Sequence, residues 1–153
     1  MNVLEIGCGI HRSGETTVAI DKIRTPQVDI VRDVAKRGIP FADNTFDQVR
    51  AYDVIEHIES YEDLIFLFNE IWRVLKPEGL FHFTTPNGVI NSFAHMTHVR
   101  AFSAGSFEYL KDVGNPEFNH MREADGIVAN FNIQFKSNQY GEQVIEGEFY
   151  AIK

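Results

Sequence analysis

The chain contains a single cysteine, Cys8, and this count excludes an intramolecular disulfide framework. Long apolar runs are absent as well, because no uninterrupted apolar stretch approaches the ~20 residues that a membrane span needs. The first residues, Met1 to Glu5, form neither the basic nor the long apolar region of a secretory signal. The sequence therefore predicts a cytoplasmic protein that does not insert into a membrane.

Basic residues are fewer than acidic ones in this chain. The chain has 14 Lys and Arg residues against 22 Asp and Glu residues, which gives a net charge of −8. Proteins that bind nucleic acid by neutralising its phosphates present a basic face instead. We therefore expect no non-specific nucleic-acid binding.

Length and composition are those of one globular domain. The chain has 153 residues, of which 44% are hydrophobic and 24% are charged, and both fractions are ordinary for a folded protein. We find no linker, internal repeat or low-complexity stretch. The sequence therefore predicts a single domain over residues 1–153.

Short apolar runs recur along the chain and predict strands. They are rich in β-branched and aliphatic residues, and turn-forming residues end most of them. They lie at residues 3–6, 17–20, 28–31, 46–52 and 80–85. A longer segment, residues 61–75, repeats apolar residues at helical spacing until Lys76, Pro77 and Gly79 stop it, which predicts a helix.

The second half of the chain adds a helix and a hairpin. Ser103 is suited to cap a helix that runs to Lys111. Residues 127–135 and 144–152 alternate between apolar and polar side chains around a turn at residues 138–141, which predicts an antiparallel pair.

Strands that alternate with turn-forming loops and helices predict an α/β fold with a mostly parallel sheet. In such folds the ligand crevice lies at the carboxyl ends of the strands. Only eleven residues separate Gly9 from Asp21, which is fewer than the dozen or more of a helical crossover. The first helix, after strand one, is therefore predicted to be shortened or absent.

Acids and glycines follow the first three predicted strands. Glu5 lies at the end of the first strand with Gly7 and Gly9 directly behind it, and the next two strands end at Asp21 and Asp33. Glycines let backbone N–H groups approach a ligand closely, and an acid after strand two can accept both hydroxyls of a ribose. The arrangement indicates a nucleoside pocket, although each residue alone also fits a structural role as a turn glycine or a cap.

A dinucleotide-binding site is one alternative. Its fingerprint, G-x-G-x-x-G, opens a helix. Here Arg12 occupies the position of the third glycine, and the space before strand two hardly holds a helix. An NAD-dependent oxidoreductase is therefore the least favoured interpretation.

Six segments taken together resemble, in order, the signatures of the class I S-adenosylmethionine-dependent methyltransferases. They are residues 3–9, 18–21, 28–33, 39–47, 53–58 and 70–79. The resemblance extends over residues 3–87 and implies S-adenosylmethionine as the cofactor. It also implies a Rossmann-like sheet of about seven strands that ends in an antiparallel hairpin.

Three departures from the family pattern concern the first strand and its loop. His11 replaces the usual third glycine, the helix after the glycine loop is missing, and the sequence begins at strand one without the helix that often covers the cofactor. These features resemble a compact bacterial subgroup, the methyltransferase-type-11-like proteins, in which a shortened glycine loop runs straight into strand two. They also leave room for a homodimer or a partner subunit that completes the pocket.

Carried over by position, the resemblance implies three groups of cofactor-binding residues, for the methionine side, the ribose and the adenine. The methionine-side group consists of Glu5, Gly7, Gly9, Ala51 and Tyr52. Asp21 would hold the ribose, and Asp33 with the backbone of Val34 would contact the adenine.

Methyl transfer from a sulfonium is an in-line displacement, so a protein contributes most by holding donor and acceptor in place. A hydroxyl acceptor gains further rate from a positioned base, whereas a nucleophilic nitrogen or sulfur needs none. His57 follows the fourth strand, and its ordinary pKa of ~6.5 suits a base. Asp53 is the second catalytic candidate. Alternatively, His57 anchors a helix start and Asp53 caps a turn.

Residues 95–103 follow the fifth strand, where such folds carry acceptor-recognition segments. His98 and Arg100 are the candidates for binding an anionic or sugar-like acceptor, and a loop packed by Val99 and Phe102 is an equal alternative. No carboxylate or cysteine lies at ligand spacing from the histidines of this segment. We therefore predict no metal site.

The sequence thus predicts an enzyme that transfers a methyl group from S-adenosylmethionine to a small-molecule or saccharide-type acceptor. The alternative from a different class is a non-catalytic adenosyl-cofactor-binding module that acts with a partner. Both should bind S-adenosylhomocysteine, and only the enzyme should turn over an acceptor.

Overall fold

The computed structural model describes residues 1–112, 114–136 and 141–153. Its strands are β1 (Val3–Ile6), β2 (Val18–Asp21), β3 (Ile30–Val31), β4 (Phe46–Tyr52), β5 (Leu75–Pro86), β6 (Phe131–Lys136) and β7 (Val144–Ala151). Its α-helices are α1 (Val34–Arg37), α2 (Tyr61–Val74), α3 (Gly88–Ser92) and α4 (Pro116–Ala124). Short 3₁₀ helices follow as η1 (Ile55–His57), η2 (Ala104–Leu110) and η3 (Gly141–Gln143).

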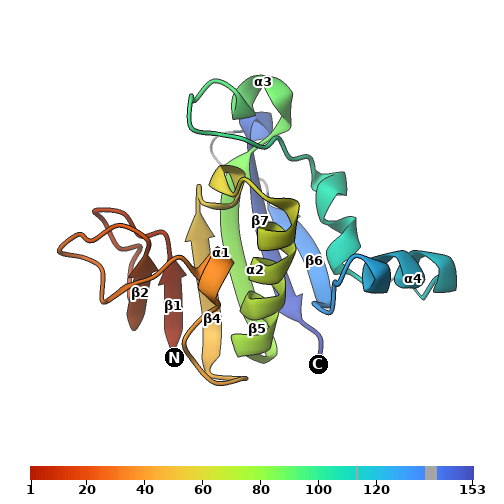
Figure 1. Ribbon diagram of the computed structural model, residues 1–153, viewed down its shortest axis with the longest axis horizontal. Helices are drawn as coiled ribbons and strands as arrows, with labels where there is room; N and C mark the ends of the chain where they lie inside the picture. Colours follow the sequence, from red (N-terminus) through yellow and green to blue (C-terminus); the bar gives the residue numbers. More distant parts are fainter. Residues whose placement is uncertain (113, 137–140) are drawn as a thin grey trace.

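The strands form one seven-stranded sheet in the order β3-β2-β1-β4-β5-β7-β6 (Figure 1). The first five strands of the chain are parallel to one another. β7 runs antiparallel to both β5 and β6. The predicted α/β fold, a mostly parallel sheet of seven strands with an antiparallel C-terminal pair, is confirmed.

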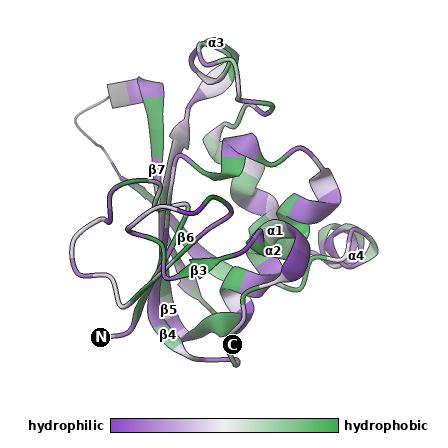
Figure 2. Ribbon diagram, turned by 60° about the vertical axis from the view of Figure 1, so that its left-hand side comes forward, coloured by the Kyte–Doolittle hydropathy of each residue, from purple (hydrophilic) through white to green (hydrophobic). Residues whose placement is uncertain are grey.

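Helix α2 covers one face of this sheet. Its start is capped by the Ser60 hydroxyl, which accepts a hydrogen bond from the Asp63 N–H at 2.9 Å and so satisfies one of the first-turn amides that a helix leaves without partners. Its buried stripe consists of Leu64, Leu67, Phe68, Ile71 and Val74. α1 and α4 lie on the same side of the sheet as α2 (Figure 2).

The core beneath α2 is aromatic. The rings of Phe81 and Phe83 stack with their centroids 4.9 Å apart, and Phe149 meets Phe83 edge-on, also at 4.9 Å. All three side chains are fully buried, and each contributes roughly 1.5–3 kcal/mol of hydrophobic stabilisation. A Cβ on Gly147 would lie 2.3 Å from Phe83 Cε1, so only glycine fits against this cluster without displacing it.

The opposite face of the sheet is polar. In β4, Gln48, Arg50 and Tyr52 alternate with residues that face the core. The Tyr52 hydroxyl is hydrogen-bonded to Nδ1 of His82 at 2.9 Å, and Nε2 of His82 is 2.9 Å from a carboxylate oxygen of Glu146. Alternation of this kind is typical of a sheet with one face on the core and one face toward water.

The predicted strands differ from the observed ones mainly at their ends. β1 and β4 have the predicted bounds, and β2 begins one residue later. α2 ends at Val74, one residue early, because Leu75 already pairs with β4 and so lengthens β5. β3 keeps only two of its four predicted residues, since Val28 packs with Cys8 and Ala19 in a separate small cluster.

Three helices were not predicted from the sequence, namely α1, α3 and α4. α4 has a clear start signal, because the Asn115 side chain accepts hydrogen bonds from the N–H groups of Glu117 and Phe118 at 3.0 and 3.2 Å. Pro116 occupies the first helical turn, where its missing N–H costs nothing.

Residues 7–17, between β1 and β2, contain no helix, as predicted. The helix predicted after Ser103 is present as the 3₁₀ helix η2 rather than as an α-helix. Residues 138–140 of the predicted hairpin turn lie outside the described residues. Among the helices that are described, none has the length and apolar character needed to cross a membrane.

Candidate functional site

A pocket of about 470 Å³ opens at the carboxyl ends of β1, β2 and β4, and α1 and α2 contribute further walls. Its volume is within the range of small-molecule sites, about 300–1,000 Å³. Of the residues singled out in the sequence, those that line it are Gly7, Asp21, Asp33, Val34, Asp53 and His57.

Side chains hold the glycine loop, residues 7–17, in place of a helix. The carboxylate of Glu5 is buried and accepts hydrogen bonds from the Ser13 N–H, at 2.9 and 3.1 Å, and from the Thr16 hydroxyl, at 2.7 Å. The guanidinium of Arg50 donates to the Ser13 carbonyl. Glu5 therefore shapes the loop from the polar face of the sheet and does not line the pocket.

Gly7 ends β1 at a point where no other residue fits. Its φ is 71°, and a Cβ at this position would lie 2.4 Å from Cγ2 of Val54. The Gly7 N–H donates to the Ile20 carbonyl at 2.8 Å. Because glycine tolerates both the positive φ and the contact, the chain after β4 packs directly against the end of β1.

Asp21 ends β2 with a carboxylate that the backbone fixes. One oxygen accepts the Gly9 N–H at 3.0 Å, and the other accepts the Ile23 N–H at 2.9 Å. Each carboxylate oxygen has a second lone pair and can accept a further hydrogen bond. Asp21 therefore offers the pocket two acceptor atoms in a fixed orientation.

Asp33 precedes α1, but its side chain makes no capping hydrogen bond to this helix. The capping role that the sequence left open is therefore not observed. Val34 is the first residue of α1, and its N–H is among those that helix geometry leaves without an intrahelical partner. The Asp33 carboxylate and the Val34 N–H, which has no partner within the helix, thus lie next to each other in the pocket wall.

Asp53 lies where β4 bends into η1. Its φ is 53°, a value that residues other than glycine adopt uncommonly. Its N–H donates to the Thr84 carbonyl at 3.1 Å, and its carboxylate accepts the Thr84 hydroxyl at 3.2 Å. Asp53 does not cap η1, because the N-cap position is Val54.

His57 ends η1 and is half-buried. Its Nδ1–H donates to the Thr97 carbonyl at 3.1 Å, and this bond leaves Nε2 with its lone pair. Burial lowers the pKa of His57, the hydrogen bond to Thr97 opposes this shift, and the positive charge of Lys22 adds to the lowering. The lowered pKa favours the neutral ring, which is the form that a base or a metal ligand needs.

Other predicted residues lie outside the pocket lining. Ala51 is fully buried in the core, and the Tyr52 side chain lies on the polar face, bonded to His82. Gly9 gives its N–H to Asp21. Gly9 therefore acts on the pocket through the position of the Asp21 carboxylate.

The segment after α3 folds onto η1 and borders the pocket through Thr97. Arg100 donates to the carbonyls of Ile58 at 2.6 Å and Glu59 at 2.8 Å. Its guanidinium thus holds this segment in place. The binding of an acceptor by Arg100 stays a prediction from the sequence.

Glu56 was not singled out in the sequence, although a carboxylate within an apolar run is an unusual feature. It is fully buried, and burial raises its pKa. One carboxylate oxygen accepts the Thr85 hydroxyl at 3.1 Å. The other has no hydrogen-bond partner among the described residues and lies 3.9 Å from Nε2 of His98.

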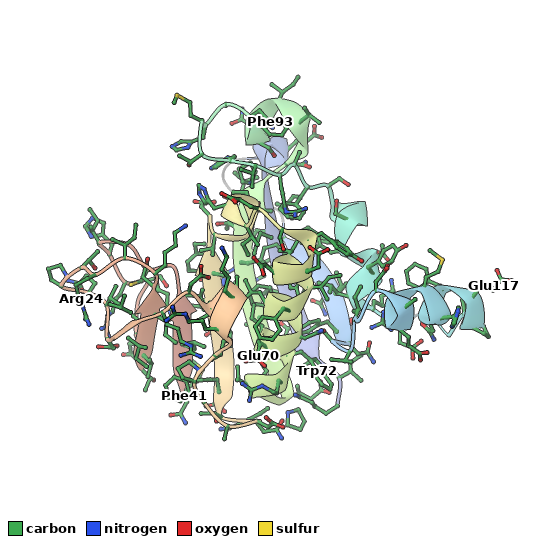
Figure 3. The ribbon with its side chains drawn as sticks, in the orientation of Figure 1. Arg24, Phe41, Glu70, Trp72, Phe93 and Glu117 are labelled. Atoms are coloured by element: carbon green, nitrogen blue, oxygen red, sulfur yellow. The ribbon has the colours of Figure 1, made fainter. Side chains whose placement is uncertain are left out.

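Exposed apolar side chains surround α3, above the carboxyl ends of the strands. Figure 3 labels Phe93 beside α3, at the top of the view. The exposed residues are Val89, Ile90, Phe93 and Met96. They form an apolar rim on the segment that also contributes Thr97 to the pocket.

Comparison with known proteins finds methyltransferases among the proteins that this chain resembles. The model of the family described as "Methyltransferase domain" matches residues 10–83. A curated relative from Mycolicibacterium smegmatis, named "Probable S-adenosylmethionine-dependent methyltransferase", is 28% identical over 168 residues, which cover 96% of this chain and 63% of the relative. The chain is thus similar in sequence to S-adenosylmethionine-dependent methyltransferases. It spans less than two thirds of the length of the curated relatives that it matches.

Solved methyltransferases share the fold. A SAM-dependent methyltransferase from Archaeoglobus fulgidus superposes with a TM-score of 0.63 and 13% identity, over 97% of this chain and 85% of the other. The Burkholderia thailandensis 1,6-didemethyltoxoflavin-N1-methyltransferase was solved with bound 1,6-didemethyltoxoflavin and S-adenosylhomocysteine. It superposes with a TM-score of 0.59 and 14% identity, over 99% of this chain and 71% of the other. At these identities the likeness shows a common fold and no more.

The cofactor of these methyltransferases is S-adenosylmethionine, and the pocket suits it. Acidic side chains outnumber basic ones in the lining, with Asp21, Asp33, Asp53, Glu59 and Asp63 against Lys22, Arg32 and Lys36. An excess of carboxylates in a cleft attracts a cation such as a sulfonium. The preorganised acceptor atoms of Asp21 match the two hydroxyls of a ribose.

Proposed function

We propose that this methyltransferase domain transfers a methyl group from S-adenosylmethionine to a small-molecule acceptor, saccharide-type acceptors included. The observation that carries the proposal is that one pocket joins Asp21 and Asp33 with Asp53 and His57. In the sheet, β2 and β4 flank β1, so the ends of these two strands are about 10 Å apart, which is two strand spacings. Gly7 lies between them.

The residues of the first three strand ends would hold the cofactor. Asp21 would accept the ribose hydroxyls, and Asp33 with the Val34 N–H would contact the adenine. Gly7 would let the backbone approach the methionine part. Glu5 is a positioning residue in this proposal, because it acts through the loop that it bonds.

The bound cofactor supplies an electrophilic methyl group on a positively charged sulfur. The contribution of the chain is orientation, since an in-line displacement gains most from donor and acceptor held at near-attack geometry. The carboxylates of Asp21 and Asp33 would fix the donor. Asp53 and His57 border the space that remains for the acceptor.

Two properties support a small acceptor. The pocket volume of about 470 Å³ has to hold the cofactor together with the reacting end of the acceptor. The net charge of −8 works against binding a polyanion such as RNA or DNA.

Calorimetry and a transfer assay test the proposal together. S-adenosylhomocysteine should bind with one molecule per chain, and a panel of small hydroxyl, amine and sugar acceptors should take up label from a methyl-labelled donor. Turnover with any of them supports the enzyme. Binding without turnover across the panel favours the non-catalytic module, and no binding at all refutes both.

A second subunit is also proposed to complete the pocket. The loop between β1 and β2 contains no helix, and a Cβ on Gly9 would meet no atom within 4 Å. Light scattering of the chain with and without S-adenosylhomocysteine tests this point. A monomer in both conditions would contradict a homodimer.

A further inference from the structure

Next to the pocket lies a cluster of three side chains, of which the proposed transfer uses only His57. Glu56 and His57 belong to η1, and His98 comes from the segment after α3. One ligand atom from each residue lies within 4.8 Å of the other two. Two imidazoles with one carboxylate are the protein ligands of a known type of zinc site, in which a fourth position stays open.

Both imidazoles are oriented by hydrogen bonds to backbone carbonyls. Nδ1 of His57 donates to Thr97 at 3.1 Å, and Nδ1 of His98 donates to Ser92 at 2.7 Å. A carbonyl oxygen can only accept, so Nδ1 is the donor in each ring and Nε2 is the ring atom left for a metal ion. Metal-binding histidines are held in this way, with the second ring nitrogen bonded to a carbonyl or carboxylate.

Glu56 supplies the negative charge of the cluster. It is fully buried, and the Thr85 hydroxyl orients one of its oxygens at 3.1 Å. The other oxygen is 3.9 Å from His98 Nε2, which is too far for a hydrogen bond, and it has no other partner among the described residues. A buried acceptor without a partner costs about 1–3 kcal/mol, and a bound cation removes this cost.

We propose that Glu56, His57 and His98 bind one divalent transition-metal ion, for which Zn²⁺ is the reference. Imidazole ligands favour such ions over Mg²⁺ and Ca²⁺, which prefer oxygen. Ligand distances of about 2.0–2.2 Å in a tetrahedral site place the ligand atoms about 3.4 Å apart. The cluster therefore contracts by roughly 1 Å on binding, and His98 can follow because it lies on a loop.

The ion would lie at the edge of the pocket, since His57 is part of the pocket lining. Its open position would take water or an oxygen atom of the acceptor. That last step rests on the proposed function, whereas metal binding does not. In this arrangement His57 is a ligand and not the base considered in the sequence.

The test is titration of the metal-free chain with Zn²⁺ by calorimetry and with Co²⁺ by visible absorption. We expect one ion per chain and the visible bands of four-coordinate Co²⁺. Glu56→Gln and His98→Ala should each weaken Zn²⁺ binding by more than about 100-fold, because loss of an outer partner alone costs about 10–100-fold. His120→Ala is the matched control, since His120 is an exposed histidine of α4, and it should leave the affinity unchanged.

Thermal melts keep the test independent of folding. Zn²⁺ should raise the melting temperature of the wild type and of His120→Ala, and it should leave that of folded Glu56→Gln unchanged. The proposal is wrong if the wild type binds no Zn²⁺, or if Glu56→Gln and His98→Ala bind it as the wild type does. Titration of the same metal-free samples with S-adenosylhomocysteine separates the two proposals. If the chain binds S-adenosylhomocysteine but not Zn²⁺, only the metal site is overturned. If it binds Zn²⁺ but not S-adenosylhomocysteine, only the proposed methyl transfer is overturned.

Discussion

The Asp21→Ala substitution tests the cofactor site most directly. In the structure the Asp21 carboxylate is held by the N–H groups of Gly9 and Ile23, so its two oxygens are already oriented before a ligand binds. Alanine removes both acceptors of the ribose hydroxyls. It removes the two loop hydrogen bonds as well.

The expected loss follows from the hydrogen bonds. A hydrogen bond to a charged group contributes about 1.5–3 kcal/mol, so the loss of two costs at least about 3 kcal/mol of binding free energy. This corresponds to a dissociation constant about 150-fold weaker. Because the Asp21 carboxylate of the wild type is already oriented, little of the free energy of these hydrogen bonds is lost in ordering the side chain on binding.

Calorimetric titration with S-adenosylhomocysteine measures the effect, and Asp29→Ala is the matched control. Asp29 also accepts a backbone N–H, that of Ala19 at 2.8 Å, and it pairs with Arg12 at 2.7 Å, but it does not line the pocket. The control should keep its affinity within about threefold, since it removes no ligand contact. If folded Asp21→Ala binds as tightly as Asp29→Ala, the placement of the ribose is refuted.

Three further substitutions test the architecture around the pocket. Gly7→Ala places a Cβ 2.4 Å from Val54 at a φ of 71°, and thermal unfolding should show a loss of about 2–4 kcal/mol together with weaker S-adenosylhomocysteine binding. Gly147→Ala forces a Cβ to 2.3 Å from a core phenylalanine ring, which should cost about 1–3 kcal/mol in urea unfolding and leave ligand affinity unchanged. The hydrogen bond from Arg73 lowers the pKa of Glu70 below its usual 4.5, so the stability that Glu70 contributes is complete above pH 4.5 and is lost as the pH falls through the lower folded value. Urea midpoints of Glu70→Gln should therefore fall less steeply on acidification than those of the wild type.

Glycines in open surroundings serve as controls for the first two changes. Gly9→Ala meets no atom within 4 Å and has a φ of 56°, so it should cost only the backbone term of about 1–2 kcal/mol. Gly105→Ala has ordinary contact at 3.7 Å and no positive φ, and it should be nearly neutral. Equal losses in Gly147→Ala and Gly105→Ala would contradict the packing explanation. If the urea midpoints of Glu70→Gln and of the wild type fell equally on acidification, the assignment to Glu70 would be wrong.

Local patterns were enough to predict the sheet and its main helix. β1 and β4 have their predicted bounds because a turn-forming residue, Gly7 or Asp53, directly follows each strand in the sequence. The signals for α2, which are the cap residue Ser60 and the apolar stripe, also lie within the helix or directly before it in the sequence. The number of strands in one sheet came from the family resemblance, which supplies long-range information that periodicity lacks. Asp21 and Asp33 line one pocket, as their strand-end positions indicated, while their roles toward the cofactor stay predictions.

Contacts between distant segments could not be predicted. No carboxylate lies at ligand spacing from His98 in the sequence, yet the fold brings Glu56 to 3.9 Å from it. The position of Arg100 depends on the same contact between η1 and the segment after α3. Such pairings are set by tertiary packing and not by the residues nearby in the chain.

The alternation within β4 carries information that the strand prediction did not use. A parallel strand covered by helices on both faces has a nearly continuous apolar sequence, whereas Gln48, Arg50 and Tyr52 are polar at every second position. The side of the sheet opposite α2 is therefore built to face water or polar groups. Glu5 and Arg50 bond the glycine loop from that side, so polar side chains of the sheet hold residues 7–17, which contain no helix.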